Sequence, residues 1–224
     1  LADLQRTNAG IARNAGARVA TGGSLFFIDG DMVLEPSFLL HALDAQRRLV
    51  HPIVTGQLPE MLYHGEGNTV GSAPDRYKIN RRHLRSAVGG IFLVSREVFD
   101  RSGGFTTGFR CNEDLDLGLR LARNGAKTLA IPHPAAMHHT VDYFDWTRLR
   151  ASLMDGSMFF PSAIFRRHVT NRYYWPVFFS QQRATATLLL GTALGLAAHP
   201  GWFAAFPAYV AAKNLRSPGA SFTQ

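Results

Sequence analysis

A short hydrophobic run that ends in two closely spaced acids constrains this sequence most. Residues 24–28 are Ser-Leu-Phe-Phe-Ile, and Asp29, Gly30 and Asp31 follow directly. Such a run predicts a buried β-strand, which places the two acids in the loop at its carboxyl end. Ligands bind at that edge of open α/β sheets. Asp-Gly-Asp is also a common turn sequence, so the tripeptide alone leaves a turn and a ligand site both open.

Short apolar segments alternate with helical segments over the first two-thirds of the sequence. Residues 62–80 are rich in glycine and polar residues and predict a loop. The alternation predicts an α/β domain with a mixed sheet flanked by helices. We expect strands near residues 24–28, 53–58, 87–95, 126–131 and 135–139, and helices near residues 10–20, 36–48, 96–101 and 112–124.

The composition changes at about residue 144, beyond which helical segments follow one another without strands. Residues 184–198 and 202–212 are apolar or weakly polar, and His199, Pro200 and Gly201 separate them. Neither segment has the roughly 20 residues that a straight membrane span needs. We therefore divide the chain into an α/β domain, residues 1–143, and a helical extension, residues 144–224. We expect the extension to form a hairpin that packs on the protein or lies in a membrane interface.

The sequence is strongly basic, with a net charge of +8 and an isoelectric point of about 10.2. Phosphorylated substrates, anionic lipids and nucleic acids all suit such a charge. The sequence contains no recognised nucleic-acid-binding motif, so we expect no nucleic-acid partner. One cysteine, Cys111, allows no internal disulfide and suits the cytoplasm. We expect a cytoplasmic protein with peripheral contact at the inner face of the plasma membrane.

Two pairs of neighbouring residues suggest chemistry in addition to Asp29 and Asp31. The carboxylates of Asp29 and Asp31 are close enough together in the sequence to hold Mg²⁺ or Mn²⁺ against a diphosphate. Glu113 and Asp114 begin the best-defined helix, where a carboxylate can take a proton from a hydroxyl group. Helix formation alone also explains acids at a helix start, with Asn112 as the cap and Asp116 paired with Arg120. His138 and His139 follow a short strand and are candidate metal ligands.

One alternative interpretation of Asp29 and Asp31 is the opening motif of haloacid-dehalogenase-type phosphatases. Asp29 would then be the nucleophile and Asp31 the acid. That family also requires a later lysine in a particular context, and Lys78, Lys127 and Lys213 do not have it.

The sequence resembles the family 2 glycosyltransferases with the GT-A fold over residues 8 to about 140. Four segments occur in the order found in that family. The Glu-Asp segment is most similar to the C-terminal segment of galactosyltransferase-type members. The segments are Asn8-Ala9-Gly10 with Ala12-Arg13-Asn14-Ala15-Gly16, then Phe27-Ile28-Asp29-Gly30-Asp31, then Gly89-Gly90-Ile91-Phe92 with Gly103-Gly104-Phe105, and finally Glu113-Asp114-Leu115-Asp116-Leu117.

The resemblance implies a role for each matching residue. Asp114 would be the catalytic base, and Glu113 beside it would hold acceptor or donor hydroxyls. Asp31 would bind the metal directly, and Asp29 would contact the donor ribose or the metal shell. The late histidine of the metal site would be His138, with His139 as the alternative. The donor-binding residues would be Gly10, Arg13, Asn14, Asp29, Gly89 and Gly90.

The resemblance implies inverting transfer of a sugar from a nucleotide-sugar donor to a glycan or lipid-linked acceptor, in polysaccharide or glycolipid synthesis. Mn²⁺ or Mg²⁺ would be the cofactor. Two departures stand out: the family's first strand and nucleobase contacts are missing, and Thr106 occupies a position where an acid often follows Gly-Gly-Phe. We therefore expect a domain truncated at its N-terminus, which leaves open that this fragment is inactive. A non-catalytic carbohydrate-binding or scaffolding protein with the same fold also remains open.

Overall fold

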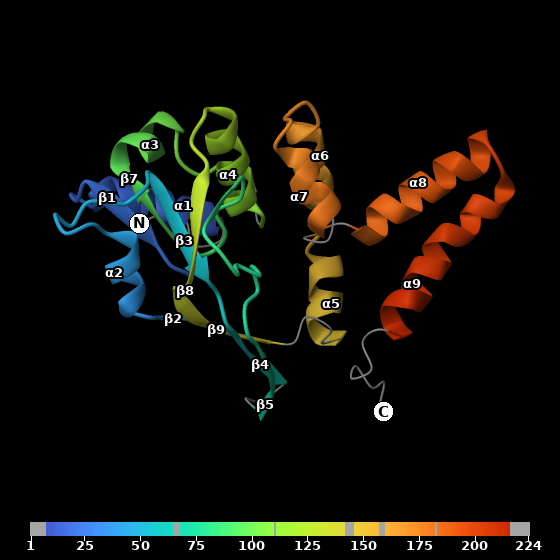
Figure 1. Cartoon of the computed structure of the whole chain (residues 1–224), viewed down its shortest axis with the longest axis horizontal. Coiled ribbons are helices and arrows are strands. Elements are labelled where there is room, and N and C mark those ends of the chain that lie inside the picture. The colour runs from blue at the N-terminus through green and yellow to red at the C-terminus, as the bar shows by residue number, and fades with distance from the viewer. Residues whose placement is uncertain are drawn as a thin grey trace. The chain divides into compact units, whose positions relative to one another are not determined.

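The computed structural model divides the chain into two units, residues 1–173 and residues 174–224 (Figure 1). It describes residues 8–64, 68–109, 111–141, 146–156, 160–181 and 183–215. The expected boundary between an α/β domain and an extension, at residues 143 and 144, remains a prediction. The strands are β1 (Ser24–Phe27), β2 (Met32–Leu34), β3 (Ile53–Gln57), β4 (Glu60–His64), β5 (Asn68–Ala73), β6 (His83–Arg85), β7 (Phe92–Ser95), β8 (Thr128–Pro134) and β9 (Ala136–Val141).

The helices are distributed over both units, and two of those beyond residue 144 belong to the first. Those of the first unit are α1 (Ala9–Val19), α2 (Ser37–Ala42), α3 (Arg96–Arg101), α4 (Glu113–Arg123), α5 (Trp146–Met154) and α6 (Phe160–His168). Those of the second unit are α7 (Tyr174–Gln181), α8 (Arg183–Ala197), the 3-10 helix η3 (Pro200–Ala204) and α9 (Ala205–Leu215). None of the helices in the described part of the chain has the length and apolar character needed to cross a membrane.

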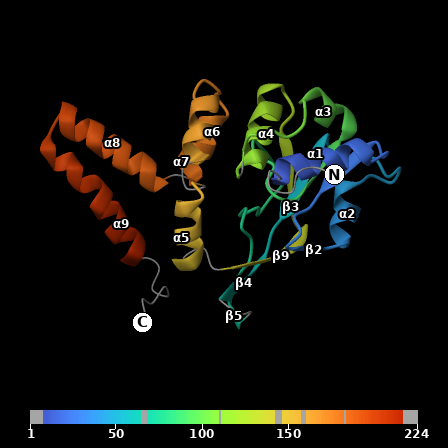
Figure 2. The ribbon, with the colours of Figure 1, turned by 180° about the vertical axis from the view of Figure 1, so that it is seen from behind.

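A five-stranded sheet in the order β1-β7-β3-β8-β6 forms the centre of the first unit. The β3–β8 pair is parallel, and the other neighbouring pairs are antiparallel. The expected α/β class, with a mixed sheet between helices, is therefore confirmed (Figures 1 and 2). The sequence did not predict β2 or β6, each of which has only three residues.

Apolar residues pack on both faces of this sheet, because successive side chains of a strand point to opposite faces. Leu25 and Phe27 of β1 pack with α1, α3 and α4, whereas Phe26 packs on the α2 side. On β7, Val94 joins the first group and Leu93 the second. The sheet is thus covered on both faces, and the segments at its strand ends carry the polar residues.

A second sheet has the order β2-β9-β4-β5. Its β4–β5 hairpin corrects the prediction of a loop over residues 62–80, since glycine and polar residues suit a sheet that is not fully buried. In the register of this sheet His138 of β9 is paired with Met32 on one side and Glu60 on the other. Because Met32 follows Asp31, the pairing brings His138 close to both acids.

Two helices differ from the sequence prediction at their ends. Helix α2 ends at Ala42 instead of near residue 48, because the Asp44 carboxylate accepts the amides of Gln46 and Arg48, at 3.0 and 2.8 Å, and forms a turn. Helix α4 starts after Asn112 as expected, but the Asn112 side chain does not cap it. With φ of 61°, the left-handed backbone of Asn112 is not the extended one that a capping residue adopts.

Candidate functional site

A single arginine of α1 joins the two acidic motifs. The Arg13 guanidinium forms ion pairs with Asp29, in the loop after β1, and with Glu113, at 2.5 Å, in the first turn of α4. It also lies 5.1 Å from the centre of the Phe105 ring. Arg13 and Glu113 are largely enclosed, with 13% and 8% of their side-chain surface exposed. The ion pairs therefore hold the loop after β1 and the start of α4 together as one site.

Asp114 lies beside this arginine and is half-buried. Burial raises the pKa of Asp114, and the charge of Asp29 adds to the rise, while the Leu115 amide and Arg13 oppose it. Burial likewise raises the pKa of Glu113, and the charge of Asp114 adds to that rise. A carboxylate with a raised pKa accepts a proton more readily, which is the property a general base requires.

Tyr77 and Arg85 are further neighbours of Asp114. The Tyr77 hydroxyl accepts the Gly90 amide at 3.0 Å, and the Arg85 guanidinium lies 4.8 Å from the centre of the Tyr77 ring. Burial raises the pKa of Tyr77 to about 12, with a contribution from the charge of Asp114. Burial lowers the pKa of Arg85, and the charges of Asp75 and Asp114 oppose this. Tyr77 therefore keeps its proton at neutral pH and can donate a hydrogen bond beside Asp114.

Gly89 and Gly90 allow the backbone to pass close to these side chains. Gly89 has φ of 91°, and a Cβ at this position would overlap the Tyr77 side chain. A Cβ at Gly90 would overlap the Asp29 carboxylate and lie 2.9 Å from Met32. The glycine pair is therefore required by close packing against Asp29 and Tyr77, and its expected contact with a donor remains a prediction.

Asp31 and His138 form a second polar group at the end of the smaller sheet. His138 Nε2 lies 3.2 Å from Asp31 Oδ2, and His138 Nδ1 lies 2.9 Å from Glu60 Oε1. Arg76 donates to the same Glu60 oxygen at 2.9 Å. Glu60 is buried, whereas Asp31 exposes 52% of its side chain. Asp31 can therefore meet a ligand from solvent, and Glu60 supports His138 from inside.

The chemistry of this group fits a divalent cation. A neutral imidazole has one N–H, yet both ring nitrogens of His138 face carboxylates. When Nδ1 donates to Glu60, Nε2 directs a lone pair toward Asp31, and such a pair of donors suits a cation. Neighbouring ligands in an octahedral site with bonds of about 2.1 Å lie about 3.0 Å apart. The distance of 3.2 Å between Asp31 Oδ2 and His138 Nε2 is compatible with that separation.

The protein alone does not enclose such an ion. Within the described ranges, no group of three or more His, Cys, Asp or Glu side chains is arranged to hold a metal. Mg²⁺ typically keeps several waters and is bound by one or two carboxylates together with substrate phosphates. Asp31 and His138 would supply the protein ligands. The expected role of Asp29 in the metal shell remains a prediction, since its carboxylate is paired with Arg13.

The neighbouring His139 has a different environment. Its Nδ1 lies 2.7 Å from the Tyr63 hydroxyl, and the two rings stack with their centres 5.8 Å apart. Successive residues of a strand point to opposite faces, so His139 points away from the group formed by His138. Of the two histidines, His138 is the one whose ring lies beside Asp31.

Gly10 and Asn14 of α1 contact the segment after Gly104. Asn14 Nδ2 donates to the Phe105 carbonyl, and Asn14 Oδ1 accepts the Phe105 amide, both at 2.9 Å. A Cβ at Gly10 would lie 3.2 Å from the Thr106 carbonyl oxygen. Both residues thus fix this segment against α1. Their expected contact with a nucleotide remains a prediction.

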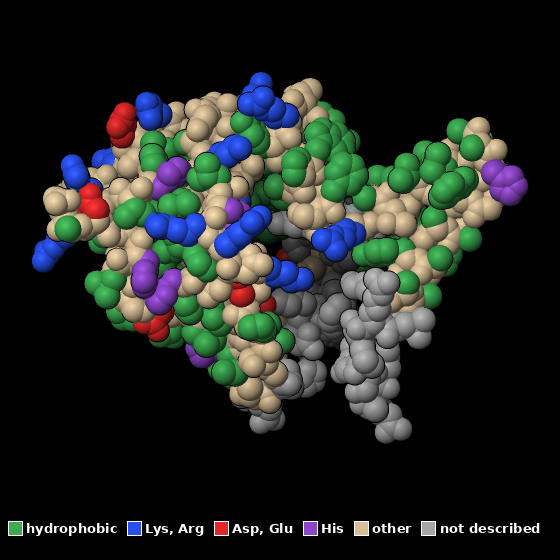
Figure 3. All heavy atoms as spheres, viewed as in Figure 1, with side chains coloured by type: hydrophobic (Ala, Val, Ile, Leu, Met, Phe, Trp, Pro, Cys, Tyr) green, Lys and Arg blue, Asp and Glu red, His purple; other side chains and the backbone are tan. Residues whose placement is uncertain are grey.

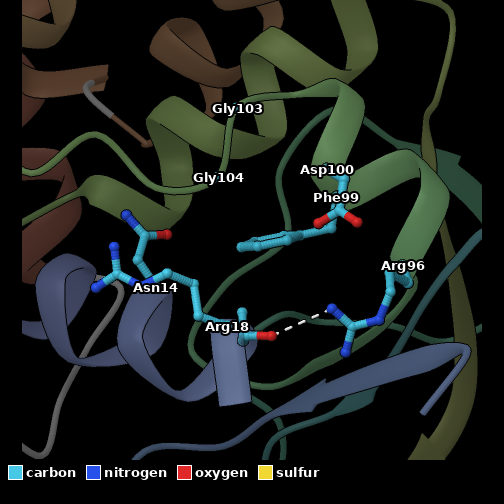
Figure 4. Close-up of a pocket in the computed structure, with 8 residues that line it drawn as sticks. Asn14, Arg18, Arg96, Phe99, Asp100, Gly103 and Gly104 are labelled. Carbon is cyan, nitrogen blue, oxygen red and sulfur yellow. Dashed lines mark hydrogen bonds between the residues drawn. The ribbon is translucent and has the colours of Figure 1, made fainter. Parts of the chain in front are cut away.

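Asn14 also lines a cavity of about 300 Å³ between α1 and α3 (Figure 4). Arg96 lies on its α3 side, but the Arg96 guanidinium donates to the carbonyls of Ala17, Ala20 and Gly22. This arginine therefore fastens the end of α1, which accounts for its position without a ligand.

Asp116 is more than a helical partner of Arg120, which is what the sequence predicted. It is fully buried, and its Oδ2 accepts bonds from Arg120 Nε at 2.9 Å and from the Thr106 hydroxyl at 2.7 Å. Its Oδ1 lies 2.7 Å from Arg167 Nε and 2.9 Å from His168 Nε2, both on α6. Burial would raise the pKa of Asp116, but hydrogen bonds from His168, Thr106 and Arg120 outweigh it and hold the pKa well below its usual range. Asp116 thus connects α4 to α6.

Several residues of this site were not predicted from the sequence. Glu60 and Arg76 support His138, and Tyr77 and Arg85 surround Asp114. All four lie in or near the segment that the sequence predicted as a loop. Glu60 could have been suspected only because it is a single acid between apolar residues. The sequence contains no pattern that points to Tyr77.

Acids gathered at strand ends and at the start of a helix, on a mixed α/β sheet, suit the binding of an activated sugar and the removal of a proton from its acceptor. The class of protein that this fold and site define is the glycosyltransferases. A family model described as "Glycosyltransferase like family 2" matches residues 4–152, more than half of the chain. The chain belongs to this family. Its membership argues against the haloacid-dehalogenase alternative.

Two known proteins are similar to parts of the chain. The O-antigen biosynthesis protein RfbC of Myxococcus xanthus is 30% identical over 147 residues, which are 56% of this chain and 12% of that protein. The crystal structure of GalNAc-T7 with UDP, GalNAc and Mn²⁺ has a TM-score of 0.46 and 16% identity, and the match covers 64% of this chain and 32% of that chain. The chain thus spans a small part of each. The family supports sugar transfer.

Proposed function

We propose that this chain transfers a sugar from a nucleotide-sugar donor to a hydroxyl group of a glycan or lipid-linked acceptor, with inversion at the anomeric carbon. The main observation in support of the proposal is that Arg13 forms ion pairs with both Asp29 and Glu113. They hold the loop with Asp29 and Asp31 against the first turn of α4 with Glu113 and Asp114. A donor bound at the loop and an acceptor bound at α4 would therefore be neighbours.

Asp114 acts as the general base in this proposal. It takes the proton from the acceptor hydroxyl as that oxygen attacks the anomeric carbon. The bond between the anomeric carbon and the diphosphate oxygen breaks, and its electron pair leaves with the diphosphate. The raised pKa of Asp114 supports this role, because a base with a higher pKa accepts a proton more readily. Glu113, which Arg13 fixes in position, would accept hydrogen bonds from sugar hydroxyls.

Asp31 and His138 would hold Mn²⁺ or Mg²⁺. When bound, the cation would neutralise the charge that develops on the leaving diphosphate. Glu60 keeps the His138 ring oriented through Nδ1, and Arg76 keeps Glu60 in place. Asp31 is half-exposed and so remains accessible to the diphosphate.

The test is a transfer assay with the full-length protein and a panel of UDP-sugars and GDP-sugars. Release of nucleoside diphosphate is measured with and without Mn²⁺ or Mg²⁺, and the configuration of the product is determined by NMR. We expect metal-dependent release and a product of inverted configuration. Retained configuration would contradict direct displacement. Donor binding without transfer to any acceptor would instead identify a carbohydrate-binding protein with this fold.

A further inference from the structure

The second unit contains a hairpin in which α8 packs against η3 and α9 (Figure 1). Among the α8 residues whose burial is described, the buried ones are Gly191 and Gly195. In contrast, Leu189, Leu190 and Leu196 expose 59%, 62% and 78% of their surface. Water-soluble proteins bury leucine far more often than they expose it in groups. The hairpin therefore places its smallest residues inside and large apolar residues outside.

The two glycines explain how closely the hairpin packs. They are four residues apart and so lie on one face of α8. A Cβ at residue 191 would lie 2.9 Å from the Trp202 carbonyl oxygen, and a Cβ at residue 195 would lie 2.7 Å from the Phe203 ring. Small residues at this spacing let two helices approach closely. This matters in apolar surroundings such as lipid, where burying leucine between helices gives no hydrophobic stabilisation.

Large apolar side chains are exposed along α8 and η3. Trp202 and Phe203 are exposed in addition to the leucines of α8. Figure 3 shows hydrophobic side chains at several places along the hairpin, with backbone and other side chains between them. The Thr187 hydroxyl of α8 donates to the Arg183 carbonyl at 2.8 Å and so does not depend on water for a partner. Several large apolar side chains exposed on one hairpin indicate an interaction site.

The charges around this surface indicate what covers it. Residues 184–212 contain no Asp, Glu, Lys or Arg. Residues 156–224 contain no acid at all, so two copies of this region would repel one another, whereas anionic headgroups would attract it. Within the second unit, residues 174–224, the basic residues are Arg183, Lys213 and Arg216.

The length of the hairpin determines how it can meet a bilayer. Helix α8 has 15 residues, which at about 1.5 Å per residue make about 22 Å. The hydrocarbon core is about 30 Å thick. A helix of this length suits a position along the interface, with its apolar side toward the acyl chains.

We propose that the α8–η3–α9 hairpin inserts its exposed apolar face into the interface of an anionic lipid bilayer. The apolar face supplies the hydrophobic contact, and Arg183 and Lys213, which flank residues 184–212 in the sequence, supply the attraction to the headgroups. This function is separate from sugar transfer and requires neither donor nor metal.

The experiment is co-sedimentation of the full-length protein with vesicles of phosphatidylcholine mixed with phosphatidylglycerol, at low and high salt. Vesicles of phosphatidylcholine alone are the comparison. We expect binding to the anionic vesicles that weakens with salt. The double variant Leu189→Asp, Leu196→Asp should bind on the order of tenfold or more weakly, because two apolar contacts are replaced by charges. Leu40→Asp, at an exposed leucine of α2, is the matched control and should bind like the wild type.

Three results would overturn the proposal. The protein could remain in the supernatant with anionic vesicles, or the double variant could bind as well as the Leu40→Asp control. A concentration-dependent dimer without vesicles, which the double variant abolishes, would assign the face to a second copy. The transfer assay with a water-soluble acceptor reports on catalysis separately, so the two proposals can fail independently.

Discussion

His138 Nδ1 lies 2.9 Å from Glu60 Oε1, and this contact determines that Nε2 is the ring nitrogen facing Asp31. Glu60 is buried and is held in turn by Arg76. A carboxylate that accepts the second N–H of a metal-binding histidine fixes the ring and makes it a stronger ligand. Glu60 is therefore a positioning residue for the proposed metal site, although it would not touch the ion.

The change Glu60→Gln tests this role. Glutamine keeps an acceptor for the His138 N–H but removes its charge, so the affinity for Mn²⁺ should fall by roughly 10-fold to 100-fold. Titration calorimetry with Mn²⁺ and UDP measures the affinity without turnover. Glu97→Gln, at an exposed glutamate of α3, is the control and should leave the affinity unchanged. An unchanged affinity in the Glu60 variant would limit that residue to supporting the fold.

The change Asp114→Asn separates catalysis from stability. Transfer should fall by roughly 10²-fold to 10⁴-fold, the usual effect of losing a general base. The free energy of unfolding near neutral pH should be unchanged or higher, because burial disfavours the charged form of Asp114 and asparagine is neutral. Kinetics and urea unfolding measure the two effects. UDP binding in the presence of Mn²⁺ should persist, and its loss would place Asp114 on the donor side.

The pH dependence of the wild-type enzyme provides an independent test of the base. Asp114 must be deprotonated to act, and burial raises its pKa. As the pH is lowered, kcat/KM should therefore begin to fall at a higher pH than an ordinary aspartate would give. The residual activity of Asp114→Asn should lack this acidic limb. The same limb in the variant would show that another group, such as Glu113 with its own raised pKa, controls the reaction.

Local sequence patterns predicted the elements that depend on near neighbours. Apolar runs gave β1, β3, β8 and β9, and the acids and Gly125 gave the bounds of α4 to within one residue. The β4–β5 hairpin was missed because its residues pair with each other and with β9, a partner more than 70 residues away. Helix α2 was predicted too long because a side-chain turn at Asp44 ends the segment, and a composition pattern does not contain that bond.

In the site, too, local patterns predicted the residues but not the contacts between residues far apart in the sequence. The resemblance named Arg13, Asp29 and Glu113, but the ion pairs that join them span 16 and 100 residues. Glu60 reaches His138 only through the parallel register of β4 and β9. Asp116 was interpreted from its own helix, whereas two of its four partners lie on α6. Short-range spacing identifies the chemical groups, and the sheet register and helix packing determine which groups meet.

The change Gly90→Ala tests the close packing beside Asp29. A Cβ at this position would overlap the Asp29 carboxylate, so Asp29 must move and its ion pair with Arg13 must weaken. We expect a clear loss of transfer activity in the assay and only a small decrease in the free energy of unfolding. Gly16→Ala is the matched control, because nothing lies within 4 Å of a Cβ there. In the interior of α1 this alanine should stabilise the protein by about 0.5–1 kcal/mol. Full activity in Gly90→Ala would show that the position of Asp29 is not critical.

The change Asp116→Asn tests the connection between α4 and α6. Asp116 is fully buried with four charged or polar partners, so its replacement should lower the free energy of unfolding by about 3 kcal/mol at neutral pH. The folded pKa of Asp116 lies below its unfolded value, so its contribution is complete above about pH 4 and declines as the pH falls further toward the folded pKa. The difference between wild type and variant should therefore be constant from neutral pH down to about pH 4 and shrink below it. Urea unfolding over this range measures it, with Asp100→Asn, at an exposed aspartate of α3, as the control. Equal, small losses in the two variants would mean that the buried network does not hold α6 to α4.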